Sequence, residues 1–298
     1  MSGKGDGCCA NCGREPSDVV KLKNCTACRL VKYCGVDCQR VHRKKHKGAC
    51  KKRVAELKDE QLYSQGQERA EGDSCPICTL PIPIPMGEHS GFHVCCMKRV
   101  CHGCNVAAQK RGMDDCPFCR TPIQEDDDAA LALVQMRVGA KDPVAIQFLG
   151  SQYYHGKCGL ERNVPRAIEL WTEAAELGST EAQFILGNKY NEGEGVMQDT
   201  AKAVQHWEKA ACQGHVKSRH NLGFIEIRNG NYERAVRHFL IAARMGDKES
   251  LDNIKDMLVQ GDATKQQYAE ALKGYQDSVQ ETKSPERDNA KEFLSYAS

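Results

Sequence analysis

The residues of this chain that are best suited to chemistry are cysteines, and they come in closely spaced pairs. Of the 18 cysteines in 298 residues, 16 lie before residue 120, in two groups of eight. The stretch CCMKRVCHGC, from Cys95 to Cys104, holds four of them within ten residues. A short turn between two sulfurs lets both side chains reach one tetrahedral metal ion. The spacing therefore predicts zinc binding.

The first group, with one histidine, forms four pairs over residues 9–50, enough ligands for two four-coordinate sites. These pairs resemble the MYND zinc finger at all eight ligand positions. The resemblance implies interleaved ligand sets, with one ion held by Cys9, Cys12, Cys34 and Cys38 and the other by Cys25, Cys28, His46 and Cys50. Cys8 and His42 remain alternative ligands. Arg43 stands where the family commonly has tryptophan.

The MYND resemblance also implies a partner class, namely short proline-containing peptides. A basic run follows the finger's third pair, from Arg40 to Arg53. It could contact phosphate groups or act as a nuclear address. The preferred interpretation is a solvated helix face that balances the anionic zinc–thiolate centres.

The second group forms four cysteine pairs over residues 75–120, and its ends, CPIC and CPFCR, resemble a RING finger. Lys98 occupies the usual histidine position, so the resemblance is to an all-cysteine variant. Cross-bracing as in RING fingers implies one ion on Cys75, Cys78, Cys101 and Cys104 and a second on Cys95, Cys96, Cys116 and Cys119. Because adjacent side chains usually diverge, His93 or His102 could replace Cys95 or Cys96.

These two fingers predict four zinc ions in total. Every position is filled by a protein ligand, so the ions are expected to be structural, with no catalytic residue among their ligands. The RING resemblance implies docking of a ubiquitin-conjugating enzyme through Ile77, Pro117 and Arg120. The alternative is that Ile77 and Pro117 only pack the zinc loops. The stretch after Cys104 lacks the tryptophan that many active RING fingers use, so enzyme activity stays open.

Beyond Asp126 the chain repeats itself. The segment AIELWTEAAELG (167–178) returns as AVQHWEKAACQG (203–214) and AVRHFLIAARMG (235–246), each preceded by a Leu-Gly pair. These units resemble Sel1-like repeats, which are helix–turn–helix modules related to tetratricopeptide arrays and offer a curved surface to protein partners. We expect repeats at 143–178, 180–215 and 216–248, and a degenerate fourth at 249–282, with Trp171 and Trp207 in the core.

The expected fold class is therefore small zinc-stabilised fingers, MYND and RING-like, followed by an all-α Sel1-like solenoid. A charged helical linker is expected at 51–74, and a linker with a packing helix at 121–142. A C-terminal helix over 283–298 should begin at Ser284-Pro285, with serine as the N-cap.

Composition excludes several function classes. The formal charge of +2 becomes about −5 once the zinc-bound thiolates and four zinc ions are counted, so no general attraction to nucleic acid is expected. No secretory signal and no run of 18 apolar residues is visible, which favours a reducing cytoplasmic or nuclear location without a membrane span. We expect a zinc-binding protein-interaction adaptor that is a candidate RING-type ubiquitin ligase. A non-enzymatic scaffold is the alternative, and a nucleic-acid-associated regulator is a weaker one.

Overall fold

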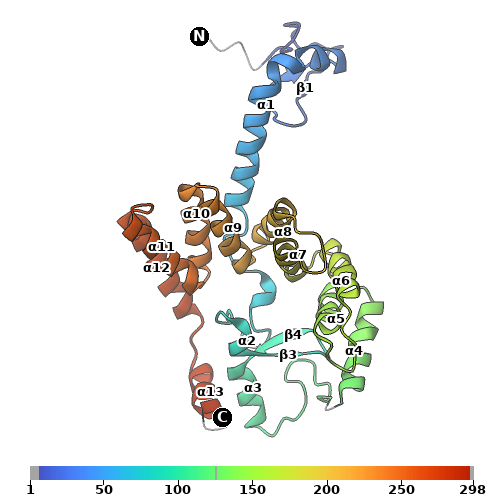
Figure 1. Cartoon of the computed structure of the whole chain (residues 1–298), viewed down its shortest axis with the longest axis vertical. Helices are drawn as coiled ribbons and strands as arrows, with labels where there is room; N and C mark the ends of the chain where they lie inside the picture. Colours follow the sequence, from blue (N-terminus) through green and yellow to red (C-terminus); the bar gives the residue numbers. More distant parts are fainter. Residues whose placement is uncertain (1–6, 125, 296–298) are drawn as a thin grey trace. The chain divides into compact units, whose positions relative to one another are not determined.

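The computed structural model describes residues 7–124 and 126–295 (Figure 1). The chain consists of two compact units, Met1–Ser64 and Gln65–Ser298. Residues 296–298 of the expected C-terminal helix lie outside the described residues. None of the described helices is long and apolar enough to cross a membrane.

The first unit is a small sheet and one long helix. Strand β1 (Lys23–Asn24) pairs antiparallel with β2 (Lys32–Tyr33), and helix α1 (Val36–Ser64) follows. The buried cluster of this unit consists of Cys9, Cys25, Cys28 and Tyr33. So few apolar side chains cannot stabilise a unit of this size, which makes its stability depend on what the cysteines bind.

The second unit begins with the cysteine-rich finger. Its elements are η1 (Glu71–Asp73), α2 (Met86–His89), β3 (Ser90–His93), β4 (Lys98–Cys101) and α3 (His102–Gln109). Strands β3 and β4 form an antiparallel hairpin in which Ser90 faces Cys101 and His93 faces Lys98. The hairpin leads straight into α3, so the third cysteine pair lies at the junction of strand and helix.

Nine helices after the finger form the solenoid, and a tenth, α13 (Pro285–Ser295), ends the described chain. They pair as α5 with α6, α7 with α8, α9 with α10, and α11 with α12, while α4 packs on α5. This confirms the predicted all-helical repeat fold. The bounds are α4 (Asp127–Gly139), α5 (Pro143–His155), α6 (Val164–Glu176), α7 (Thr180–Glu192), α8 (Thr200–Cys212), α9 (Val216–Arg228), α10 (Tyr232–Arg244), α11 (Lys248–Gln260) and α12 (Lys265–Glu281).

The repeated Leu-Gly pair is the contact point between the two helices of a repeat. A Cβ atom added at Gly187 would lie 2.4 Å from Nε1 of Trp207, and one at Gly150 would lie 2.8 Å from the Trp171 ring. Both tryptophans are about 2% exposed, which confirms them as core residues. The glycines thus let an aromatic side chain of the second helix lie against the backbone of the first.

The finger and the N-terminal end of the solenoid share one core. Met97, in the turn between β3 and β4, is buried in the same apolar cluster as Val134 and Trp171. Phe92 of β3 stacks on Phe148 of α5 with ring centroids 5.2 Å apart. The turn end of the finger hairpin therefore packs against the helices α4 to α6 (Figure 1).

The segment after Ser64 departs from the expected helical linker. Helix α1 stops at Ser64, and residues 65–70 lie against the α8–α9 junction. A Cβ at Gly214 would meet the Glu68 carbonyl oxygen at 2.3 Å, and Arg219 donates to the Gln65 carbonyl oxygen at 2.5 Å. Tertiary contacts with the solenoid replace the local helical hydrogen bonds that the charged sequence favoured.

Candidate functional site

The first finger brings together both predicted ligand sets. In each set the candidate ligand atoms all lie within 4.8 Å of one another; the sets are Cys9, Cys12, Cys34 and Cys38, and Cys25, Cys28, His46 and Cys50. The histidine ring nitrogen Nε2 lies 3.1 Å from the Cys28 sulfur. Helix α1 positions His46 and Cys50, which are four residues apart and therefore share a helix face.

The alternative ligands of this finger lie outside both clusters. Cys8 is not among the four ligands of either set. His42 accepts or donates a hydrogen bond with the Tyr33 hydroxyl at 3.1 Å and stacks on His46, with centroids 5.9 Å apart. His42 therefore packs beside the second cluster instead of joining it.

The second finger gathers its eight cysteines into two interleaved clusters. Cys75, Cys78, Cys101 and Cys104 form one, and Cys95, Cys96, Cys116 and Cys119 form the other, again with all sulfurs within 4.8 Å. This is the cross-braced arrangement that the RING resemblance implies. Pairs one and three thus meet in one cluster, and pairs two and four meet in the other.

The adjacent cysteines reach one cluster because the chain turns tightly around them. The Cys96 amide donates to the His93 carbonyl oxygen at 3.2 Å, and Met97 takes a left-handed backbone conformation with φ 54°. His93, an alternative ligand, instead hydrogen-bonds Asn105 at 3.1 Å. Neither His93 nor His102 belongs to a four-sulfur cluster.

Four of the cysteine pairs sit in the same backbone turn. In each, the amide of the first cysteine donates to a carbonyl oxygen five or six residues ahead, and the residue four positions after that cysteine has a left-handed backbone. Those residues are Gly13, Arg29, Thr79 and Arg120, with φ between 57° and 72°. The spacing predicted the turns, but only Gly13 carries a sequence signal for this conformation.

The sulfur spacing fits zinc. A tetrahedral ion with bonds of about 2.3 Å to sulfur separates its ligands by about 3.8 Å. The sulfur–sulfur distances are 3.6 Å for Cys12–Cys34, 3.8 Å for Cys78–Cys101 and 3.9 Å for Cys96–Cys116. A disulfide would require a sulfur–sulfur distance of about 2.05 Å, and no cysteine among the described residues forms one.

The protonation of the sulfurs also calls for a cation. Burial raises the pKa of Cys9, but hydrogen bonds from the backbone of Cys12 and Cys34 outweigh it and leave that pKa at about 6. Hydrogen bonds to Cys38 and Cys12 raise the pKa of Cys34 to about 12. Some thiols of a cation-free cluster therefore stay protonated. A bound zinc ion supplies the charge that lets all four ionise.

Four such clusters fit four zinc ions, as predicted. Zinc bound there cross-links segments that are distant in sequence and leaves no open coordination position, so it supplies stability and not a reactive water. One solenoid side chain supports the last cluster: Arg137 of α4 donates to the Cys95 carbonyl oxygen from Nε at 3.1 Å and Nη2 at 3.0 Å.

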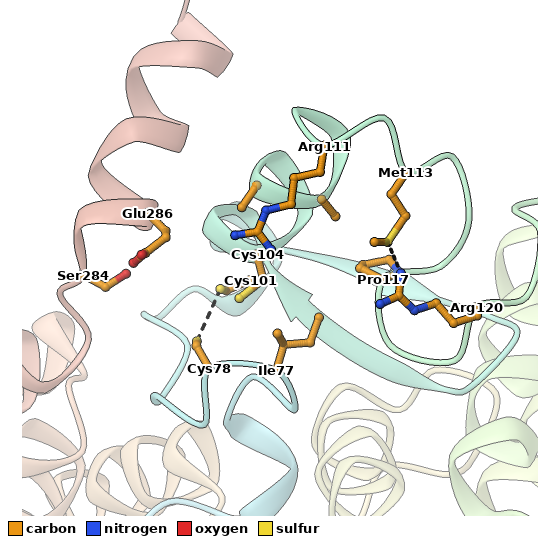
Figure 2. A pocket seen from close by; sticks show the side chains of 12 residues that line it. Ile77, Cys78, Cys101, Cys104, Arg111, Met113, Pro117, Arg120, Ser284 and Glu286 are labelled. Carbon is orange, nitrogen blue, oxygen red and sulfur yellow. Dashed lines mark hydrogen bonds between the residues drawn. The ribbon is translucent and has the colours of Figure 1, made fainter.

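The three predicted partner-binding residues line one groove. Ile77 comes from the first turn of the second finger, whereas Pro117 and Arg120 come from its last turn. The groove has a volume of about 320 Å³ and is also lined by residues of α3 and by Ser284 and Glu286. Figure 2 shows the lining side chains. Ile77 is 42% exposed. The tertiary structure thus joins residues that lie 43 positions apart in the sequence.

The basic run of α1 is a solvated helix face. Its lysines and arginines are mostly exposed, and several pair with acidic residues of the same helix. Arg53, for example, contacts Glu56 at 3.1 Å and Glu60 at 2.7 Å. Such surface pairs contribute little to stability. The run forms no separate site.

Comparison with known proteins identifies two modules. The MYND finger model matches residues 9–50, and the Sel1 repeat model matches residues 143–179, 180–215 and 219–247. Chitin synthase regulatory factor 4 of Schizosaccharomyces pombe is 30% identical over 108 residues, which is 36% of this chain and 17% of that protein. An uncharacterized protein of Neisseria meningitidis serogroup B is 32% identical over 115 residues, 39% of this chain and 24% of that protein. The chain thus spans less than a quarter of either relative.

Two solved structures are similar to part of the chain. One is a protective antigen of uropathogenic Escherichia coli with an SLR fold, at 28% identity and TM-score 0.44, covering 51% of this chain and 33% of that chain. The other is a Sel1 repeat protein from Oxalobacter formigenes, at 26% identity and TM-score 0.45, covering 60% and 68%.

MYND fingers and Sel1 repeats are protein-interaction modules, and the four clusters fit zinc. The chain is therefore a zinc-binding protein-interaction adaptor with an N-terminal MYND finger and a Sel1 repeat solenoid, joined by a second, all-cysteine finger.

Proposed function

We propose that this adaptor acts as a RING-type ubiquitin ligase in a reducing compartment, the cytoplasm or the nucleus. The second finger docks a ubiquitin-conjugating enzyme, and the MYND finger or the repeats select the protein to be modified. One observation carries the proposal: Ile77, Pro117 and Arg120 line a single exposed groove of a cross-braced finger.

Ile77 supports the docking role through its exposure. Fully burying an isoleucine side chain stabilises a complex by about 1.5–3 kcal/mol. Since 42% of Ile77 is exposed, covering it with a partner contributes about 1 kcal/mol. That is enough to change the affinity about 5-fold.

Arg120 supports the transfer role through its available donors. Its guanidinium is exposed, and its hydrogen-bond partner among the described residues is the Met113 sulfur. The remaining N–H groups are able to donate to a partner, and a planar guanidinium can contact two acceptors at once. Held between conjugating enzyme and ubiquitin, such a side chain orients the thioester for attack by the acceptor amine, with no nucleophile supplied by this chain.

The competing candidate is a non-enzymatic adaptor. The groove side of α3 carries the small residues Ala107 and Ala108, and Arg111 lines the groove just after this helix. Glu286 of α13 adds a wall on the other side. A conjugating enzyme that relies on an aromatic contact with the helix after the third pair would find none here.

An autoubiquitination assay distinguishes the two candidates. Zinc-replete protein is incubated with a panel of conjugating enzymes, ubiquitin, activating enzyme and ATP. We expect chain formation with at least one conjugating enzyme, a loss of about 5-fold for Ile77→Ala, and a loss of about 10-fold or more for Arg120→Ala, since charged hydrogen bonds contribute about 1.5–3 kcal/mol.

Matched controls exist within the chain. Arg29 occupies the same left-handed turn position in the MYND finger, so Arg29→Ala makes the same change at a residue that does not line the groove. Ile123 is 56% exposed and does not line the groove. If both controls lower activity as much as Ile77→Ala and Arg120→Ala, the groove is not the docking surface. If no conjugating enzyme supports chain formation, the non-enzymatic adaptor is the remaining candidate.

A further inference from the structure

The last helix packs on the second finger and not only on the solenoid. In Figure 1, α13 lies beside α3. Their backbones approach closely at Gly103, where an added Cβ would lie 2.8 Å from the Arg287 amide nitrogen. Lys110, the C-cap residue of α3, lies over the Phe293 ring, 5.3 Å from its centroid. The chain end thus returns to a finger about 180 residues earlier in the sequence.

Arg287 is the polar centre of this contact. The residue is 7% exposed. Its Nη1 donates to the carbonyl oxygens of Pro81 and Thr282, each at 2.6 Å. Its Nη2 donates to the Leu80 carbonyl oxygen at 3.1 Å and to the Cys78 sulfur at 3.5 Å. One guanidinium therefore joins the first turn of the finger to the end of α12.

The hydrogen bonds of Arg287 connect its charge to one cysteine cluster through the Cys78 sulfur. Within residues 7–124 and 126–295, none of its hydrogen-bond partners is a carboxylate. A buried cation without a counter-charge is strongly unfavourable. Four thiolates around one zinc ion carry a net charge of about −2. The cluster that contains Cys78 supplies the missing negative charge.

We propose that Arg287 retains zinc in this cluster, so that α13 is a functional part of the first zinc centre of the second finger. The guanidinium neutralises part of the thiolate charge and donates an N–H to Cys78. Because the same side chain bonds Thr282 at the C-terminal end of α12, zinc binding in the finger and docking of α13 stabilise each other. This inference does not depend on ubiquitin transfer.

The test follows zinc release at each cysteine separately. The full zinc-loaded chain is mixed with a strong zinc chelator and N-ethylmaleimide, and alkylation of every cysteine is followed by peptide mass spectrometry. Zinc-bound sulfurs react only after release. Removing a group that supports a metal ligand typically weakens binding 10–100-fold. We expect Arg287→Ala to accelerate alkylation of Cys75, Cys78, Cys101 and Cys104 by that factor.

The cysteines of the MYND finger are internal references in the same sample, and their rates should not change. Lys291→Ala is the matched control, because Lys291 is an exposed cation of the same helix that pairs with Asp288. Arg287→Lys keeps the charge but cannot reach four acceptors, so an intermediate rate is expected. Wild-type rates for Arg287→Ala, or equal acceleration in the MYND finger, would overturn the proposal.

Two further measurements do not depend on whether the Arg287→Ala variant folds. Gly103→Ala changes no charge but forces α13 away from α3, so it should also accelerate release from the same four cysteines. In the wild-type chain, removal of zinc should speed amide hydrogen exchange within Pro285–Ser295. Unchanged exchange in that helix after zinc removal contradicts the coupling.

Discussion

The close contact between Gly187 and Trp207 makes one substitution especially informative. Replacing a helical glycine with alanine normally stabilises a helix by about 1 kcal/mol. At Gly187 the new Cβ would lie 2.4 Å from Nε1 and 2.5 Å from Cδ1 of Trp207. We therefore expect Gly187→Ala to destabilise the solenoid, although alanine has a higher helix propensity than glycine.

The size of the effect follows from the geometry. An ordinary contact begins at 3.4 Å, so the indole must move by about 1 Å in a core whose atoms are closely packed. Overpacking of this kind costs about 1–3 kcal/mol. After the helix-propensity gain of about 1 kcal/mol is subtracted, a net loss of up to about 2 kcal/mol remains. With a urea dependence of about 2 kcal/mol per molar, the unfolding midpoint should fall by up to about 1 M.

The chain carries its own reporter for this measurement. Its two tryptophans, Trp171 and Trp207, are both buried in the solenoid. Urea unfolding followed by tryptophan fluorescence therefore reports the solenoid and not the MYND finger. Gly139→Ala is the matched control, because Gly139 is a helical glycine of α4 with no atom within 4 Å of its added Cβ. That variant should be as stable as the wild type or slightly more so.

A double mutant separates the clash from other effects. In a Trp207→Leu background the indole is absent, so adding Gly187→Ala should cost much less than it does alone. The non-additivity measures the contact directly, and Trp171 remains as the reporter. The reasoning is refuted if Gly187→Ala is as stable as Gly139→Ala, or if its cost is unchanged in the Trp207→Leu background.

Zinc removal and pH give the remaining predictions. Elemental analysis should find about four zinc ions per chain. A strong chelator should lower the urea midpoint of the solenoid, because Met97 and Phe92 of the second finger pack into its core. An unchanged midpoint contradicts this second prediction. Burial, together with Arg219 and neighbouring arginines, lowers the pKa of His238 to about 3. Between about pH 3 and about pH 6.5, His238 binds a proton in the unfolded chain but not in the folded chain. The free energy of unfolding should therefore fall as pH drops from about 6.5 toward 3, by up to about 1.4 kcal/mol per pH unit. His238→Leu should remove that part of the slope in urea titrations at pH 7, 6 and 5, and an identical slope would argue against it.

Much of this architecture could be predicted from residue spacing alone. Pairs such as Cys9 and Cys12 direct two sulfurs to one ion through a turn of three or four residues, which is a local property. The repeats could also be predicted from the sequence, because residues equivalent to Leu186-Gly187 and Trp207 occur at corresponding positions of successive units. The first three Sel1 repeats match close to the predicted repeat bounds. Helix caps such as Asp142 and Ser179 act within their own turn, which makes the start of a repeat a local property.

Other features depend on segments that are distant along the chain. The sequence left open whether His93 could replace one of the adjacent cysteines; the hairpin turn at Met97 brings both Cys95 and Cys96 to the same cluster. It also predicted a helix through residue 74, whereas contacts with α8 and α9 hold residues 65–70 in a different conformation.

What the sequence by itself determined was the pairing of close ligands, such as Cys75 with Cys78, and the helical register of the repeats, because both arise from interactions within a few residues. Only the tertiary structure decided that α13 returns to the second finger and that Arg287 contacts Cys78. The buried guanidinium lies 209 positions from the sulfur that it contacts, so no spacing pattern in the sequence indicates the contact. Its place is set by the summed packing of the solenoid that lies between them.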